Sequence, residues 1–252
     1  MILRRISEHV KGQNWFAVAL DFLIVVLGVF LGIQLGNWNE ARLERAQSAV
    51  FTRALAADLR ADAGTYRGVA GYYASVRDNA ERVLESLEGG APLSDENLLI
   101  SAYRASQVAL VPVNRSTFEE LVSTGRINLI TDAALRQTAI KHFGFDYIEA
   151  AAADGRLSDY RSLFRRTMPP DAHRAAREHC GDVASTDIIA LDYQCVLGLA
   201  DDAMRQAAEA LRAEPAMPSA LRSRINELDV QTHDLITRAT VLERALSPDA
   251  QP

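Results

Sequence analysis

A run of apolar residues near the N-terminus is the strongest pattern in the chain. From Phe16 to Gly36, only Asp21 and Gln34 are polar. A bilayer core about 30 Å thick requires roughly 20 mostly apolar residues in a helix. The run is therefore long enough to cross a membrane. We expect residues 15–39 to form a transmembrane anchor, preceded by a basic tail of residues 1–14.

Small and apolar residues recur every three or four positions after this run, as one face of a helix requires. The positions are Leu43, Ala46, Val50, Ala54, Ala57, Ala61, Val69, Tyr73, Val76, Ala80, Val83 and Leu87. The pattern predicts a long stalk helix over residues 40–90 that continues directly from the anchor. Gly89 and Gly90 are expected to end it, because glycine suits a left-handed C-cap.

The remaining soluble part, residues 91–246, is predicted to be helical as well. In chain order, the expected helices are 94–108, 116–124, 132–168 and 201–214, with breaks in the third near Gly144 or Gly155. Pro169 and Pro170 are expected to end the third helix. Residues 171–200 are expected to be the least regular part.

The last helix, residues 218–246, has the clearest periodicity. Apolar or small residues alternate gaps of four and three, which is a heptad seam: Leu221, Ile225, Leu228, Thr232, Leu235, Ala239, Leu242 and Leu246. The simplest partner is the Val69–Leu87 seam, packed antiparallel within one chain. An intermolecular coiled coil is the alternative. The predicted class is all-α, an antiparallel helical bundle with a disordered tail at residues 247–252.

Composition and the motif search argue against a nucleic-acid-binding protein and against an enzyme. The net charge is −6, and no run of Lys or Arg is longer than two residues, as at Arg165-Arg166, so no nucleic-acid-binding surface is expected. The HExxH, GxSxG, P-loop and dinucleotide-binding motifs are not found. Glu119 and Glu120 resemble an acid pair, but adjacent helix residues do not face each other. We therefore expect no catalytic residues, no cofactor and no enzyme.

Two cysteines, Cys180 and Cys195, bear on the location of the soluble part. Basic residues near the two ends of the anchor are balanced, so they do not decide the orientation. An even count at short spacing favours one disulfide in an oxidising compartment. The alternatives are two free thiols in a cytosolic domain, or zinc shared with His173 and His179, whose spacing matches no standard site. No A-x-A-like site follows the apolar run, which favours an uncleaved anchor over a signal peptide.

Three glycines in the anchor are spaced by four: Gly28, Gly32 and Gly36. Small residues at this spacing form a groove that allows two helix backbones to approach closely. Asp21 lies seven residues before Gly28 and shares that face. A carboxyl at membrane depth normally faces a partner or water. The stripe predicts a helix–helix interface; the alternative is a common membrane-helix composition with Asp21 reaching the nearby interface.

Residues 116–130, STFEELVSTGRINLI, predict a structural corner in the soluble part. Ser116 is expected at the N-cap and Glu119 at N3 of a capping box. Gly125 is expected to end the short helix in a left-handed conformation. Phe118 and Leu121 are expected to face the core.

The stretch Asp21–Glu40 resembles an uncharacterised family of bacterial single-pass membrane proteins. These proteins begin with a basic tail, an acidic residue and an apolar run that ends in a Gly-Ile and Asn-Trp-Asn-Glu pattern, here at 32–33 and 37–40. Residues 116–130, followed by Leu135-Arg136, are similar to the second signature of the family. The acid is more often glutamate there, and Gly36 is often larger. The resemblance, over residues 1–150, implies one membrane span and a helical domain but no activity.

Together these patterns favour an interaction or scaffold protein of the bacterial envelope. We expect the anchor to lie in the lipid bilayer and to associate there with a second copy of itself or with another membrane protein. The expected location is the inner membrane, with the N-terminus inside and the soluble domain in the periplasm. The alternative is a periplasmic ligand-sensing domain that signals through a membrane partner, which a polar pocket between helices would favour.

Overall fold

The computed structural model describes residues 15–184, 189–191 and 193–247. Most of this part is α-helical. The strands among the described residues are an antiparallel pair of two residues each, β1 (Val183–Ala184) and β2 (Ile189–Ala190). The all-α prediction is therefore confirmed. The predicted basic tail, residues 1–14, and residues 248–252 of the predicted disordered tail lie outside the described residues.

The chain divides into two compact units, residues 1–52 and 53–252, and helix α2 (Trp15–Leu87) contributes to both. In the first unit the apolar side chains of α2, such as Phe22 and Leu31, are largely exposed. By length and composition this helix is able to cross a membrane. The helix continues without a break from the apolar run to Leu87, as predicted.

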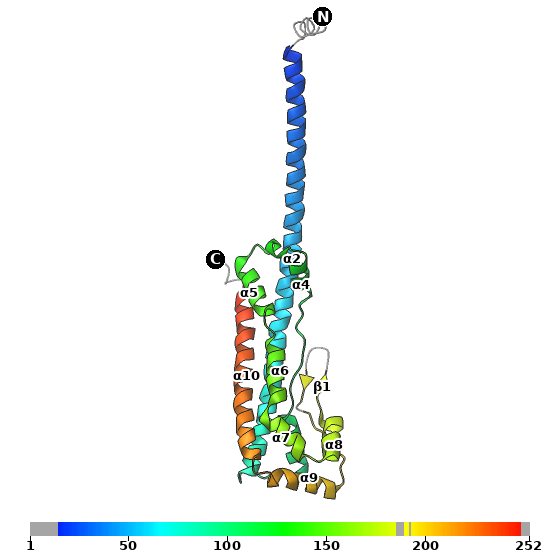
Figure 1. Cartoon of the computed structure of the whole chain (residues 1–252), viewed down its shortest axis with the longest axis vertical. Coiled ribbons are helices and arrows are strands. Elements are labelled where there is room, and N and C mark those ends of the chain that lie inside the picture. The colour runs from blue at the N-terminus through cyan, green and yellow to red at the C-terminus, as the bar shows by residue number, and fades with distance from the viewer. Residues whose placement is uncertain (1–14, 185–188, 192, 248–252) are drawn as a thin grey trace, which may run out of the picture. The chain divides into compact units, whose positions relative to one another are not determined.

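The second unit packs further helices around the later part of α2 (Figure 1). In chain order these are α3 (Asp95–Ala105), α4 (Ser116–Ser123), the 3₁₀ turn η1 (Ile127–Leu129), α5 (Ala133–Phe143), α6 (Tyr147–Leu157), α7 (Asp159–Thr167), α8 (Pro170–Cys180), α9 (Asp201–Ala213) and α10 (Met217–Ala245). Ser94 caps α3 as expected, accepting the Asn97 N–H at 3.3 Å. The predicted helix 132–168 is interrupted twice, after Phe143 and at Ser158.

The end of α2 is a glycine C-cap, as predicted. Gly89 has a φ of +88°, a left-handed conformation that costs glycine little because it has no Cβ. The Gly90 N–H donates to the Glu85 carbonyl at 2.9 Å, which is the 6→1 bond of a Schellman motif. The chain can therefore turn away from α2 and enter α3.

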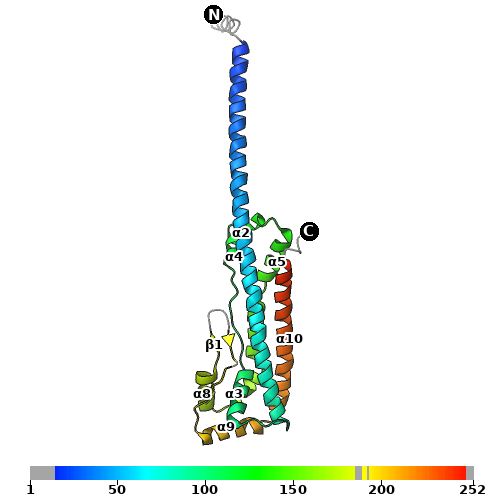
Figure 2. The same cartoon turned by 180° about the vertical axis from the view of Figure 1, so that it is seen from behind.

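Helix α10 packs antiparallel on the second-unit part of α2, as Figures 1 and 2 show from opposite sides. Three ion pairs connect the two helices in antiparallel order: Arg67–Glu243, Arg77–Asp229 and Arg222–Glu88. The heptad positions Leu221, Leu228, Leu235, Ala239 and Leu242 are buried. The seam is thus covered within one chain, which supports the intramolecular alternative.

The buried face of α2 differs from the predicted one before Val69. Val50, Ala57 and Ala61 are exposed. The residues buried there are Leu55, Leu59, Asp62, Ala63 and Tyr66. Alanine contributes little apolar area, so the larger leucine and tyrosine side chains decide which face turns inward. From Val69 to Val83 the predicted positions are buried.

Helix α8 and the two strands occupy a region that was predicted to be irregular. Pro170 does not end a helix; it is the first residue of α8. Proline is favoured at this position because the first N–H of a helix has no intrahelical partner and the ring fixes a helical φ. The buried face of α8, Ala172, Ala176 and Cys180, belongs to the main core with α3, α7 and α9.

Candidate functional site

The four residues predicted as a helix–helix interface lie on α2 in the first unit. Asp21, Gly28, Gly32 and Gly36 are all exposed. A Cβ built on any of the three glycines meets no described atom within 4 Å. Helical geometry keeps the four residues within one stripe, and no described part of the same chain covers that stripe.

The cysteine pairing predicted from the sequence is confirmed. Cys180 and Cys195 form a disulfide with a Cα–Cα distance of 5.4 Å, within the usual range. Cys180 ends α8 and is buried. The bond therefore attaches the segment before α9 to the main core, and it engages both sulfur atoms that the zinc alternative required.

The corner at residues 116–130 is confirmed in part. Gly125 has a φ of +69°, as predicted. Leu121 is fully buried, and the half-buried ring of Phe118 stacks on Phe143 with centroids 4.8 Å apart. Arg136 donates to the Ile130 carbonyl at 2.6 Å. The ring contact holds α4 against the end of α5, and the Arg136 bond ties the start of α5 to Ile130.

The predicted capping box is wrong. Ser116 is the first residue of α4 rather than its N-cap, and Arg115 at the N-cap makes no side-chain cap bond. The side chain of Asn114 takes this role, because its Oδ1 accepts bonds from the Ser116 N–H at 3.2 Å and from the Ser116 hydroxyl at 2.9 Å. Glu119 is exposed. The asparagine also reaches α2, where its Nδ2 donates to Asp58 at 3.0 Å.

Asn114→Ala is expected to cost about 1 kcal/mol of folding free energy, as loss of a helix cap does. Ser116→Ala removes only the hydroxyl and serves as the matched control, with an expected cost of a few tenths of a kcal/mol. Urea unfolding followed by circular dichroism measures both. A larger cost for Ser116→Ala than for Asn114→Ala would contradict the assignment of the cap.

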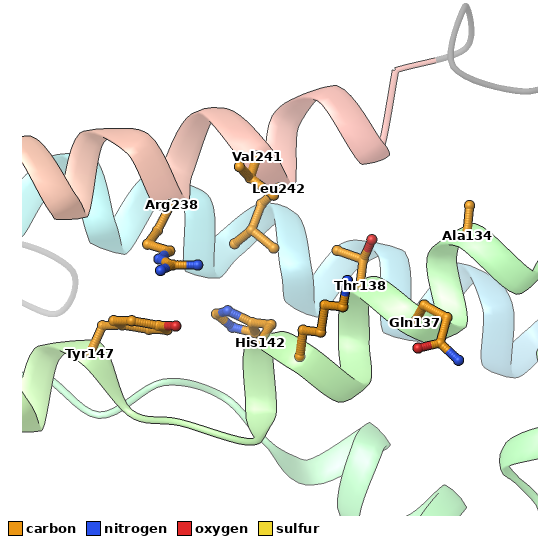
Figure 3. Close-up of a pocket in the computed structure, with 9 residues that line it drawn as sticks. Ala134, Gln137, Thr138, His142, Tyr147, Arg238, Val241 and Leu242 are labelled. Atoms are coloured by element: carbon orange, nitrogen blue, oxygen red, sulfur yellow. The ribbon is translucent and has the colours of Figure 1, made fainter.

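A pocket between α5, α6 and α10 was not predicted from the sequence. It has a volume of about 320 Å³, and Figure 3 shows its side chains. Its lining residues are Ala134, Gln137, Thr138, Lys141, His142, Tyr147, Arg238, Val241 and Leu242. We call this the α5–α10 pocket. Its lining contains two side chains with permanent positive charge and no carboxylate.

A buried partner on α2 holds His142, one of the residues that line the α5–α10 pocket. His142 Nε2 lies 2.8 Å from Asp62 Oδ2, and both side chains are less than 5% exposed. The second oxygen of Asp62 accepts the backbone N–H of Asn114 at 3.2 Å. These bonds fix the orientation of the imidazole.

Aromatic rings contact two of the residues that line the pocket, His142 and Arg238. Tyr66 packs edge-on against His142 with ring centroids 5.5 Å apart. Burial raises the pKa of the Tyr66 hydroxyl well above its usual value, so this side chain remains neutral. At the rim, the guanidinium carbon of Arg238 lies 4.1 Å from the centroid of the Tyr147 ring. Such cation–π contacts hold an arginine plane in place while its N–H edge remains free to donate.

The residues of the pocket come from three distant parts of the chain. Asp62 and His142 are separated by 80 positions. Arg238 follows His142 at an even greater separation in the sequence. No local motif connects them, and His142 alone is one histidine among five. The one sequence feature that could have indicated the pocket is weak: Lys141, one of two lysines in the chain, stands next to His142.

Comparisons with known proteins give no further assignment. No family model, curated protein or solved structure matches the chain. The resemblance to the bacterial membrane family therefore remains a prediction. Function must be argued from the two features on the surface, the exposed stripe of α2 and the α5–α10 pocket.

Proposed function

We propose that this protein is a membrane-anchored interaction or scaffold protein of the bacterial envelope. The observation that carries the proposal is the exposed apolar part of α2, which no described segment of the chain covers. Exposed apolar surface of this extent is unfavourable in water and favourable in a bilayer. The anchor lies in the inner membrane, and the second unit is the soluble domain.

The soluble domain is assigned to the periplasm. The Cys180–Cys195 bond supports this assignment, because disulfides persist in the periplasm and are rare in the cytosol. The numbers of basic residues on the two sides of the apolar run are equal, so they neither favour nor oppose a periplasmic location of the soluble domain. The N-terminal residues are accordingly cytoplasmic.

The stripe of Gly28, Gly32 and Gly36 is the proposed interaction surface in the membrane. Glycines on one face let a second helix approach closely, so that van der Waals contacts replace contacts with lipid. Asp21 lies on the same stripe, where its carboxyl would meet a polar group of the partner. The proposed partner is a second copy of this anchor, with another membrane protein as the alternative.

Gly32→Ile is expected to weaken association of the anchor by about tenfold, because the new side chain prevents close approach of the two backbones. Phe30→Ile introduces the same residue on the opposite face and is the matched control. A transmembrane-helix association assay on residues 15–39 measures both. Equal association of wild type and Gly32→Ile would show that the stripe is not a self-association surface, and would favour a foreign helix.

A second candidate function is ligand sensing by the soluble domain through a membrane partner. The α5–α10 pocket favours it, since a pocket of this size with convergent polar groups is the usual form of a small-molecule site. The pocket lies between α5, α6 and α10, and its lining residue His142 contacts Asp62 of α2. A bound ligand would therefore bias the packing of the helix that continues into the anchor.

A further inference from the structure

The charge of the α5–α10 pocket separates it from the other surface hollows of the second unit. Lys141 and Arg238 line the pocket, and neither forms an ion pair with a described carboxylate. By contrast, the hollow between α6 and α10 is lined by Asp154, Asp159 and Glu227. The α5–α10 pocket is thus a site of positive charge on a domain that is acidic overall.

Two acids that adjoin lining residues of the pocket make other bonds. Asp62 lies beneath His142 and accepts bonds from that ring and from the Asn114 backbone. Asp146 caps α6, where it accepts the Glu149 N–H at 3.0 Å. Neither residue lines the pocket. Nine arginines among the described residues of this domain form ion pairs with carboxylates, and Lys141 and Arg238 are not part of any of these pairs.

The polar groups of the pocket converge from two sides. Figure 3 shows the Arg238 side chain of α10 and the His142 ring of α5 directed toward each other, with the Tyr147 ring beneath the guanidinium. The guanidinium fork donates two parallel hydrogen bonds to a carboxylate or phosphate. Thr138 and Gln137 add neutral donors and acceptors along α5.

One part of the pocket wall is apolar. Val241 and Leu242 of α10 and Ala134 of α5 line it, and Val241 is 47% exposed although it is a large aliphatic residue. An inorganic anion would leave this wall in contact with water. A ligand with an acidic group and a compact apolar body would cover both walls, and the volume of about 320 Å³ admits a molecule of that kind.

We infer that the α5–α10 pocket binds a small organic anion. Its acidic group is held by Arg238 and Lys141 beside the fixed imidazole of His142, and its apolar body lies against Val241 and Leu242. The inference rests on the ligand-sensing function proposed above and specifies its ligand class. It does not depend on self-association of the anchor.

The test uses the full chain in detergent micelles and benzoate as the probe, with neutral benzamide as its matched analogue. Binding is measured by calorimetry or by ligand-observed nuclear magnetic resonance. Benzoate is expected to saturate one site and to bind at least about tenfold more tightly than benzamide, because only benzoate engages the guanidinium fork. Inorganic phosphate is expected to bind more weakly than benzoate.

Arg238→Gln and Lys141→Gln are each expected to weaken benzoate binding, the first by about tenfold. Both side chains are exposed, so the fold tolerates the changes. Arg244→Gln, on the same helix and exposed, is the matched control and should leave affinity unchanged. Equal loss in Arg244→Gln, no saturable binding by the wild type, or equally tight binding of phosphate would overturn the inference.

Measuring association of the full chain with and without benzoate tests the sensing function separately from the binding site. Benzoate binding that leaves association of the full chain unchanged would refute sensing through the anchor and leave the site intact. Lack of binding would refute the site, whereas the effect of Gly32→Ile on association would be unaffected.

Discussion

Arg224→Ala is expected to lower the free energy of unfolding by about 4 kcal/mol, the largest effect of any single substitution proposed here. Arg224 lies on α10, and its side chain is fully buried. Its guanidinium donates to the Gln107 carbonyl at 2.9 Å and to the Ala105 carbonyl at 3.4 Å. Alanine would leave these carbonyl oxygens without a partner and open a cavity, and both effects are costly.

Arg222→Ala is the matched control for this prediction. Arg222 lies on the same helix and pairs with Glu88, but both side chains are about half exposed. Exposed ion pairs contribute at most about 1 kcal/mol. Urea unfolding of the full chain in a nonionic detergent, followed by far-ultraviolet circular dichroism, compares the two variants. Similar effects of both would mean that the Ala105 and Gln107 carbonyls do not depend on Arg224.

Loss of the Cys180–Cys195 disulfide is expected to lower the free energy of unfolding by about 3 kcal/mol, as closure of a loop of roughly 15 residues predicts. The chain has two cysteines, so a reductant acts on this bond alone. Reduced wild type and the double variant Cys180→Ala/Cys195→Ala should lose similar amounts. The double variant should not respond to reductant.

The redox state in cells tests the proposed location at the same time. Acid quenching followed by alkylation of free thiols should show both cysteines protected in the wild type. If both are alkylated without added reductant, the periplasmic assignment is wrong. If reductant lowers the free energy of unfolding by less than about 1 kcal/mol, the unfolded chain is already compact without the disulfide.

Features that depend on neighbours in the chain were predictable. Gly89 and Ser94 were recognised as the end of one helix and the start of the next, because helix ends depend on a few consecutive residues. The heptad seam of α10 was recognised because seven-residue spacing by itself defines a helix face. The disulfide was recognised because the chain offers a single pairing.

Errors arose where two local rules competed. Ser116 and Glu119 match a capping box, yet Asn114 supplies the cap because its amide also reaches Asp58 on α2. The early face of α2 was misassigned because alanines at helical spacing do not define a buried face. Pro170 was taken as a stop although proline is equally suited to start a helix.

By itself, the sequence determined that this chain has an apolar segment of membrane-spanning length, a mainly helical remainder and one disulfide. These follow from composition, periodicity and pairing, which are local properties. Only the tertiary structure decided what the helices bring together. It placed Asp62 within hydrogen-bonding distance of His142, and Arg238 across the pocket from His142, from segments far apart in the chain. It also placed Gly155 against Arg224, where an added Cβ would lie 3.3 Å from the guanidinium. Such contacts depend on how helix faces pack, and no local pattern in the chain specifies that packing.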